Sequence, residues 1–144
     1  MTKLICASIF TLILVSCGQN SSQTDNGKEA IDKVCDRVMQ TFAKGNFSQA
    51  FDILKQNTVM SSSSIDTLKS TTDNYAKNVF PTYGKIRSYE FISEHKIKDV
   101  IAKRFYILKF DKYYLKFDFT IYNNGDNWTI TSFSYDEDLV ELLF

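Results

Sequence analysis

The stretch that decides the fold is Tyr113–Tyr122, with the sequence YYLKFDFTIY. One set of alternate residues is apolar: Tyr113, Leu115, Phe117, Phe119 and Ile121. The other set is mostly polar: Tyr114, Lys116, Asp118, Thr120 and Tyr122. Because successive side chains of a strand point to opposite faces, this alternation predicts a strand with one covered face and one in water. Each large apolar side chain fully buried contributes about 1.5–3 kcal/mol, which favours packing of helices on the apolar face.

The same kind of pattern extends over the C-terminal half of the chain. β-Branched and aromatic residues are dense and turns are close together, so the sequence predicts strands near 86–94, 100–110, 113–122 and 128–135. Residues 123–127, Asn-Asn-Gly-Asp-Asn, form a hairpin connection, since asparagine and glycine accept positive φ.

Upstream of these strands the periodicity is helical. Apolar residues recur at three and four from Ala30 to Phe42, and Gly45 is a fitting stop. Asn46 is expected to cap a second, shorter helix, and a third continues from Ile65 to Val79 after a serine run, 61–64, that serves as loop and N-cap. Pro81 and Gly84 are expected to end it. Helices followed by a meander predict an α+β fold.

The first sixteen residues are typical of a secretory signal peptide. One cation, Lys3, precedes an apolar run from Leu4 to Val15, and the small residue Ser16 follows. The run of twelve is shorter than the roughly 20 residues needed to span a bilayer, so a permanent transmembrane helix is not expected.

The run ends in Leu14-Val15-Ser16-Cys17, which resembles the bacterial lipobox. That resemblance implies cleavage before Cys17 and attachment of acyl chains such as palmitate, and two or three chains make membrane anchoring stable. Gly18, where aspartate would resemble an inner-membrane retention signal, favours the outer membrane in a Gram-negative cell. The expected organisation is signal peptide 1–16, lipidated cysteine and flexible tether 17–27, and one α+β domain, 28–144.

Composition agrees with an exported domain. Removal of Lys3 leaves 16 Lys and Arg against 17 Asp and Glu, a balance that argues against a nucleic-acid binder. Of three cysteines, Cys6 is discarded and Cys17 lipidated, so Cys35 has no partner for an intramolecular disulfide and is expected in the core.

Two short stretches carry a resemblance to the nuclear transport factor 2-like superfamily, especially its small exported families of unknown function. They are Tyr83-Gly84-Lys85-Ile86, opening the first long strand, and Gly125–Ile130, GDNWTI, opening the last. The resemblance covers most of residues 28–135 and implies a curved four-stranded sheet that forms a cone around the helices. The apolar C-terminus after Asp136-Glu137-Asp138 departs from that pattern and is expected to cover the cone or to meet a partner.

Catalytic chemistry has little support in the residues. Isomerases of this superfamily use an aspartate in an apolar pocket, and Asp111 has the strand parity to edge one, although a turn acid is the simpler interpretation. The single histidine, His95, cannot build a closed zinc site without cysteine partners, and no phosphate loop or serine elbow is present. We therefore expect no metal and no cofactor.

Seven cations of the strand half, interleaved with tyrosines, fit either an anion-binding surface or a solvated sheet face with acids nearby. They are Lys96, Lys98, Lys103, Arg104, Lys109, Lys112 and Lys116.

The leading hypothesis is a membrane-anchored, non-enzymatic accessory domain that binds a protein partner or a small apolar ligand through the aromatic cone mouth. The alternatives are a small-molecule isomerase or hydrolase using Asp111, and a structural or dimer-forming lipoprotein that needs the tail 139–144.

Overall fold

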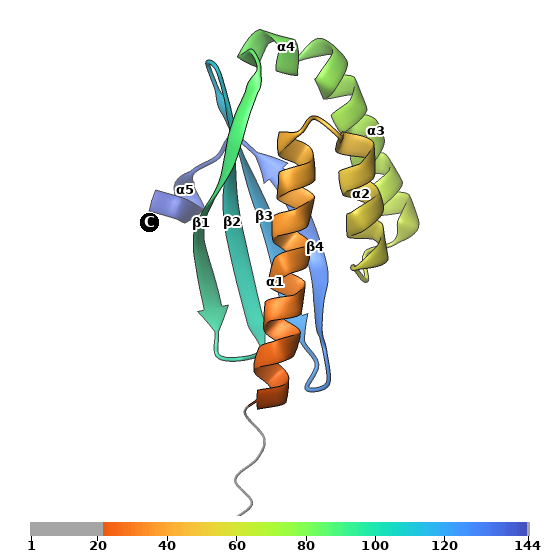
Figure 1. Cartoon of the computed structure of the whole chain (residues 1–144), viewed down its shortest axis with the longest axis vertical. Helices are drawn as coiled ribbons and strands as arrows, with labels where there is room; N and C mark the ends of the chain where they lie inside the picture. Colours follow the sequence, from red (N-terminus) through yellow and green to blue (C-terminus); the bar gives the residue numbers. More distant parts are fainter. Residues whose placement is uncertain (1–21, 144) are drawn as a thin grey trace, which may run out of the picture.

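Four strands form an antiparallel meander in the computed structural model, which describes residues 22–143 (Figure 1). The strands are β1 (Ile86–Ile97), β2 (Ile101–Phe110), β3 (Tyr114–Asn123) and β4 (Trp128–Asp136), and they lie in the order β1-β2-β3-β4. The four predicted strands are confirmed, with shifts of at most three residues at their ends. Each hairpin joins neighbours in the sheet, as short connections require.

The helices are α1 (Ser22–Ala43), α2 (Phe47–Gln56), α3 (Ser62–Asn78), α4 (Phe80–Tyr83) and α5 (Val140–Leu143). Helix α1 lies along one face of the twisted sheet, α2 packs against α1, and α3 packs against α2 (Figure 1). The chain is therefore an α+β protein in which N-terminal helices pack on a curved, antiparallel four-stranded sheet, as predicted.

Two helix ends differ from the prediction in detail. Asn46 occupies the N-cap position of α2 but its side chain makes no capping hydrogen bond, whereas the Ser61 hydroxyl accepts one from the backbone N–H of Ser64 at 3.1 Å. Pro81 does not end α3. It lies in the first turn of α4, where its missing N–H removes no helical bond, and Gly84 at φ 88 ends that helix.

Helix α1 begins earlier than the apolar periodicity predicts. It already includes residues 22–27, the last part of the range 17–27 expected to be a flexible tether. Gly27 lies so close to Trp128 that an added Cβ would sit 3.5 Å from the indole Cδ1. The sheet therefore contacts α1 at Gly27, at the N-terminal edge of its apolar stripe. The predicted signal peptide, Cys17 and the start of the tether lie outside the described residues.

Aromatic rings fill the space between helices and sheet. Ring centroids lie 5.1 Å apart for Phe42 and Phe117, 5.3 Å for Phe42 and Phe51, and 5.0 Å for Phe119 and Phe133. These spacings are those of directly packed aromatic pairs. The concave face is thus a closed hydrophobic core, and the inward parity predicted for Leu115, Phe117, Phe119 and Ile121 is confirmed. The prediction is wrong for Tyr113, which precedes β3 in the turn and is 40% exposed.

The opposite face of the sheet is not uniformly wet, which corrects the prediction for β3. Lys116 and Asp118 are only 3% and 4% exposed. The C-terminal segment after β4 crosses this face: Tyr114 donates to the carbonyl of Glu137 at 3.2 Å, and Glu141 of α5 accepts from Lys103 at 2.6 Å. The tail therefore covers the outer sheet face rather than the cone.

Among the described residues, no helix is both long enough and apolar enough to span a bilayer.

Candidate functional site

Asp111 lies in the β2–β3 turn, away from the core. Its carboxylate accepts a hydrogen bond from the backbone N–H of Lys85 at 2.9 Å and is paired with Arg87. The Lys85 N–H and then Arg87 hold the pKa of Asp111 below its usual value. An ionised carboxylate that closes a turn is poorly suited to act as a general base, so the geometry gives Asp111 a structural position.

His95 and Cys35 are also separated from any constellation. His95 lies on the outer face of β1 with its ring 5.2 Å from that of Phe105. Cys35 is fully buried, and burial raises the pKa of its thiol to about 12. Within residues 22–143, no group of three or more His, Cys, Asp and Glu side chains is placed to hold a metal ion.

The seven cations do not form one surface. Lys109 pairs with Glu90 at 2.7 Å, Lys116 with Asp136 at 3.0 Å, and Lys103 with Glu141 on the outer face. Arg104 points the other way, into the helix–sheet interface. Opposite charges beside most of these cations leave little field for a polyanion.

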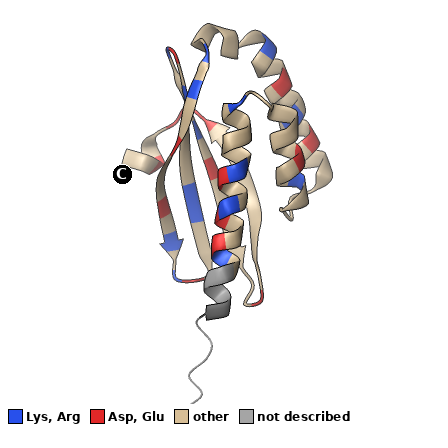
Figure 2. Ribbon diagram, in the orientation of Figure 1, with Lys and Arg blue, Asp and Glu red and all other residues tan. Residues whose placement is uncertain are grey.

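A cluster of charged side chains ties α1 to β1 and β2, and the sequence interpretation missed it. Five charged residues and one tyrosine take part: Lys28, Asp32, Asp36, Glu94, Arg104 and Tyr106. We call this set the α1–sheet ionic cluster. Lys28 and Arg104 both donate to one oxygen of Glu94, at 2.7 and 2.8 Å. Tyr106 donates to Asp36 at 2.6 Å. Figure 2 shows acidic and basic residues alternating along the middle of α1.

Burial sets the electrostatics of this cluster. Lys28 and Arg104 are only 9% and 8% exposed. Burial disfavours the charged form of Glu94, but the hydrogen bonds from Lys28 and Arg104 outweigh it, so the pKa of Glu94 lies below its usual 4.5. Burial, and then the bond to Asp36, raise the pKa of Tyr106. Every member already has a partner, so the cluster holds α1 on the sheet and offers no open position for a substrate.

Two signals in the sequence point to the cluster. Lys28, Asp32 and Asp36 are spaced by four, so they share one helix face. Arg104 has the same parity as the apolar residues Ala102, Tyr106 and Leu108 of β2, so a charge stands on the inward face. Neither signal predicts the cluster unless it is already known that α1 packs on β1 and β2 beside Glu94 and Arg104.

A pocket of about 240 Å³ opens beside the cluster, where α1 meets the ends of α2 and β4. Its lining is Gly27, Ala30, Ile31, Val34, Asn57, Asn127 and Trp128. We call it the Trp128 pocket. The indole Nε1 is buried and has no hydrogen-bond partner among the described residues. Its neighbouring ring atom Cδ1 would lie 3.5 Å from a Cβ added at Gly27, which also lines the pocket. Lys28 Nζ lies 5.7 Å from the ring centroid.

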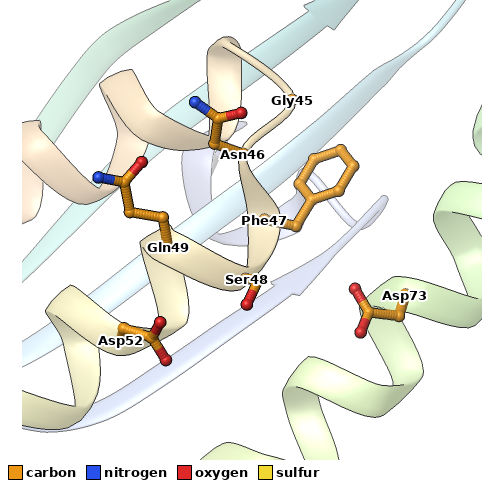
Figure 3. A pocket seen from close by; sticks show the side chains of 7 residues that line it. All are labelled: Gly45, Asn46, Phe47, Ser48, Gln49, Asp52 and Asp73. Carbon is orange, nitrogen blue, oxygen red and sulfur yellow. The ribbon is translucent and has the colours of Figure 1, made fainter.

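A larger depression, of about 480 Å³, lies between the start of α2 and α3. Figure 3 shows that Asp52 of α2 and Asp73 of α3 stand on its two sides, with Ser48 between them. Asp52 accepts from Lys69 at 3.3 Å, and the polar side chains of the lining are exposed except for Asp73, which is half-buried. Exposed polar side chains are satisfied by water, so this depression offers a ligand little beyond solvent.

No family model, no curated protein and no solved structure matches this chain.

Proposed function

We propose that the mature chain is a lipid-anchored envelope protein whose domain binds a small apolar ligand in the Trp128 pocket without catalysing a reaction. The observation that carries the proposal is the buried indole N–H beside that pocket. A buried donor without an acceptor costs about 1–3 kcal/mol. Because Nε1 is closed to solvent, a ligand oxygen accepts from it and recovers this free energy only when the indole or the start of α1 shifts on binding.

The lining defines the chemistry of the ligand. Ile31 and Val34 supply apolar surface, and Trp128 supplies one aromatic face. About 240 Å³ is less than the volume of most drug-sized sites, so the pocket fits one end of a longer molecule or a short chain. We infer a narrow apolar group that ends in a carbonyl, carboxylate or hydroxyl oxygen.

The same lining argues for binding rather than catalysis. None of its seven residues is an acid, a histidine, a lysine, a tyrosine, a serine or a cysteine. General acid–base and nucleophilic catalysis both need such a group within hydrogen-bond distance of the reacting atom. The enzymatic alternative also loses its candidate, because Asp111 is bound within a turn.

Trp128 is the single tryptophan of the chain, so its emission reports directly on the pocket. The test is a titration of lipidated protein in detergent with fatty acids, alcohols and alkanes of matched chain length. We expect saturable emission changes and a higher melting temperature with the oxygen-bearing members, since a ligand that binds only the folded state stabilises it. The Trp128→Phe variant keeps an aromatic ring without the N–H but has no tryptophan emission, so its melting temperature is the readout. We expect this variant to lose the preference for acids over alkanes. A flat response in emission and melting temperature across the series would overturn ligand binding.

A second candidate function is capture of a protein partner at the edge of the sheet. The exposed apolar residues Phe91 and Ile92 lie on β1, which is an edge strand. The other edge strand, β4, is covered where Thr58 bridges Ile130. An exposed edge with apolar side chains can accept an added strand. Ile92→Lys should abolish crosslinking to a partner in envelope membranes while leaving the response of Trp128 to ligands unchanged.

A further inference from the structure

The hairpin between β1 and β2 ends in a group of exposed apolar side chains. Ile97 is 67% exposed, Val100 45% and Tyr122, on the neighbouring strand, 40%. Ile97 and Tyr122 both pair with Ile101 in the sheet, so they lie on one face, and the backbone N–H of Asn123 donates to the Val100 carbonyl at 2.8 Å. We call Ile97, Val100 and Tyr122 the apolar tip.

The apolar tip lies at the end of the molecule where α1 begins (Figure 1). Lys28 of α1 contacts Glu94 of β1 at 2.7 Å, so these two residues lie at about the same height along the molecule. From that level α1 runs back six residues to Ser22, about 9 Å at the rise of a helix. Strand β1 runs three residues on to Ile97, about 10 Å at the rise of a strand. Ser22 and the tip therefore reach nearly the same height.

The position of Cys17 then limits how far the tip stands from the anchor. Four residues lie between Cys17 and Ser22, and the five steps from one Cα to the next span at most about 18 Å when fully extended. If lipid on Cys17 holds the chain, the end of the sheet that carries the β1–β2 and β3–β4 hairpins faces the bilayer (Figure 1). The opposite end, with α4 and the β2–β3 turn, points away from it (Figure 1).

We propose that the apolar tip inserts into the headgroup region of the bilayer that holds the lipidated Cys17 and so fixes the orientation of the domain. This inference rests on the lipid anchor in the proposed function. Tyrosine at the headgroup level and lysine above it are typical of interfacial segments, and Lys96 and Lys98 flank Ile97. Asp99 lies in the β1–β2 loop and Asp126 in the β3–β4 loop. Both charge signs are therefore present at this end of the sheet, and the proposed contact with the bilayer is mainly apolar.

The test uses the lipidated full chain in vesicles of phosphatidylethanolamine and phosphatidylglycerol that carry brominated acyl chains. A Lys98→Cys variant is labelled with an environment-sensitive fluorophore. Cys35 is buried and the Cys17 sulfur is alkylated, so the new thiol alone reacts. Lys112→Cys, in the β2–β3 turn at the far end, is the matched control. We expect blue-shifted emission and loss of most of its intensity for the label at position 98, and neither change for the label at position 112.

A second variant tests the apolar contact itself. Ile97→Asp with Val100→Asp, made in the Lys98→Cys chain, should restore the emission at position 98, while an unchanged melting temperature shows that the fold is kept. Equal emission from both labelled positions would overturn the inference, and so would tip-to-tip crosslinking of two copies. Intact mass separates the two proposals. A chain without acyl mass on Cys17 refutes the anchor, whereas an acylated chain with an unquenched tip refutes only the insertion.

Discussion

The guanidinium of Arg104 donates to the carboxylate of Glu94 at 2.8 Å inside the interface between α1 and the sheet. The two residues lie on neighbouring strands and pair in register. The same guanidinium lies 3.0 Å from Asp32 of α1. Arg104 and Lys28 both pair with Asp32 of α1 and Glu94 of β1, so removal of Arg104 leaves these two half-buried carboxylates with Lys28 alone.

We expect Arg104→Met to lower the free energy of unfolding by about 3–5 kcal/mol, the usual cost of breaking a buried pair from one side. Chemical denaturation measures this loss. Lys109→Met is the matched control, because Lys109 pairs with Glu90 at the exposed surface and such pairs contribute little. Equal effects of the two substitutions would contradict the central position of Arg104 in the cluster.

The pH dependence of stability should report Glu94. Its pKa is lower in the folded chain than its usual 4.5, because bonds from Lys28 and Arg104 outweigh burial. A group with a lowered folded pKa stabilises above its unfolded pKa, and this contribution is lost as pH falls through the folded pKa. Melting temperature should therefore fall as pH drops below about 4.5. Glu94→Gln should have a lower melting temperature at pH 7, and its melting temperature should fall less steeply at acidic pH, the acid limb of the curve. An acid limb that is identical in the variant would refute this assignment.

Gly84 and Asp111 form a close contact that no other residue at position 84 allows. Gly84 has φ 88, and an added Cβ would lie 2.6 Å from the Asp111 Cβ. Gly84→Ala combines backbone strain with an overpacked contact, which adds about 1–3 kcal/mol. Gly45→Ala is the control: at φ 74 it has strain but no atom within 4 Å. Thermal unfolding should show a larger loss for Gly84→Ala, and equal losses would mean that Asp111 moves away freely.

Thiol counting tests both the anchor and the core. Cys35 is fully buried with a pKa raised by burial to about 12, so an alkylating reagent should not modify the native chain at pH 8. After unfolding, the lipidated mature chain should show one reactive thiol, because the Cys17 sulfur is a thioether. The unprocessed precursor should show three, from Cys6, Cys17 and Cys35. Two thiols in mature protein isolated from membranes would refute lipidation of Cys17.

The sequence predicts the α+β class and the strands because Tyr113–Tyr122 alternates so regularly and the turns contain glycine and asparagine. It does not predict that Lys116 and Asp118 are buried, since their cover comes from a C-terminal segment whose path depends on tertiary contacts. The Trp128 pocket cannot be predicted from the sequence either. Its walls come from α1, α2 and β4, and only the folded chain brings Gly27 beside Trp128.

The C-terminal segment gives the last prediction, which bears on the dimer-forming alternative. The Glu141 carboxylate accepts a hydrogen bond from Lys103, and the backbone carbonyl of Glu137 accepts one from Tyr114. Phe105, on the same outer face of the sheet, is only 1% exposed. If the tail were a dimer interface, truncation after Asp138 would convert a dimer into a monomer. Because the tail instead packs on its own sheet, we expect truncation to uncover apolar surface and to increase self-association. Light scattering of the full and truncated chains measures the direction. Glu141→Gln, which weakens the bond to Lys103 without exposing apolar atoms, is the control and should leave the mass unchanged. A truncated chain of smaller mass than the full chain would support the dimer-forming alternative.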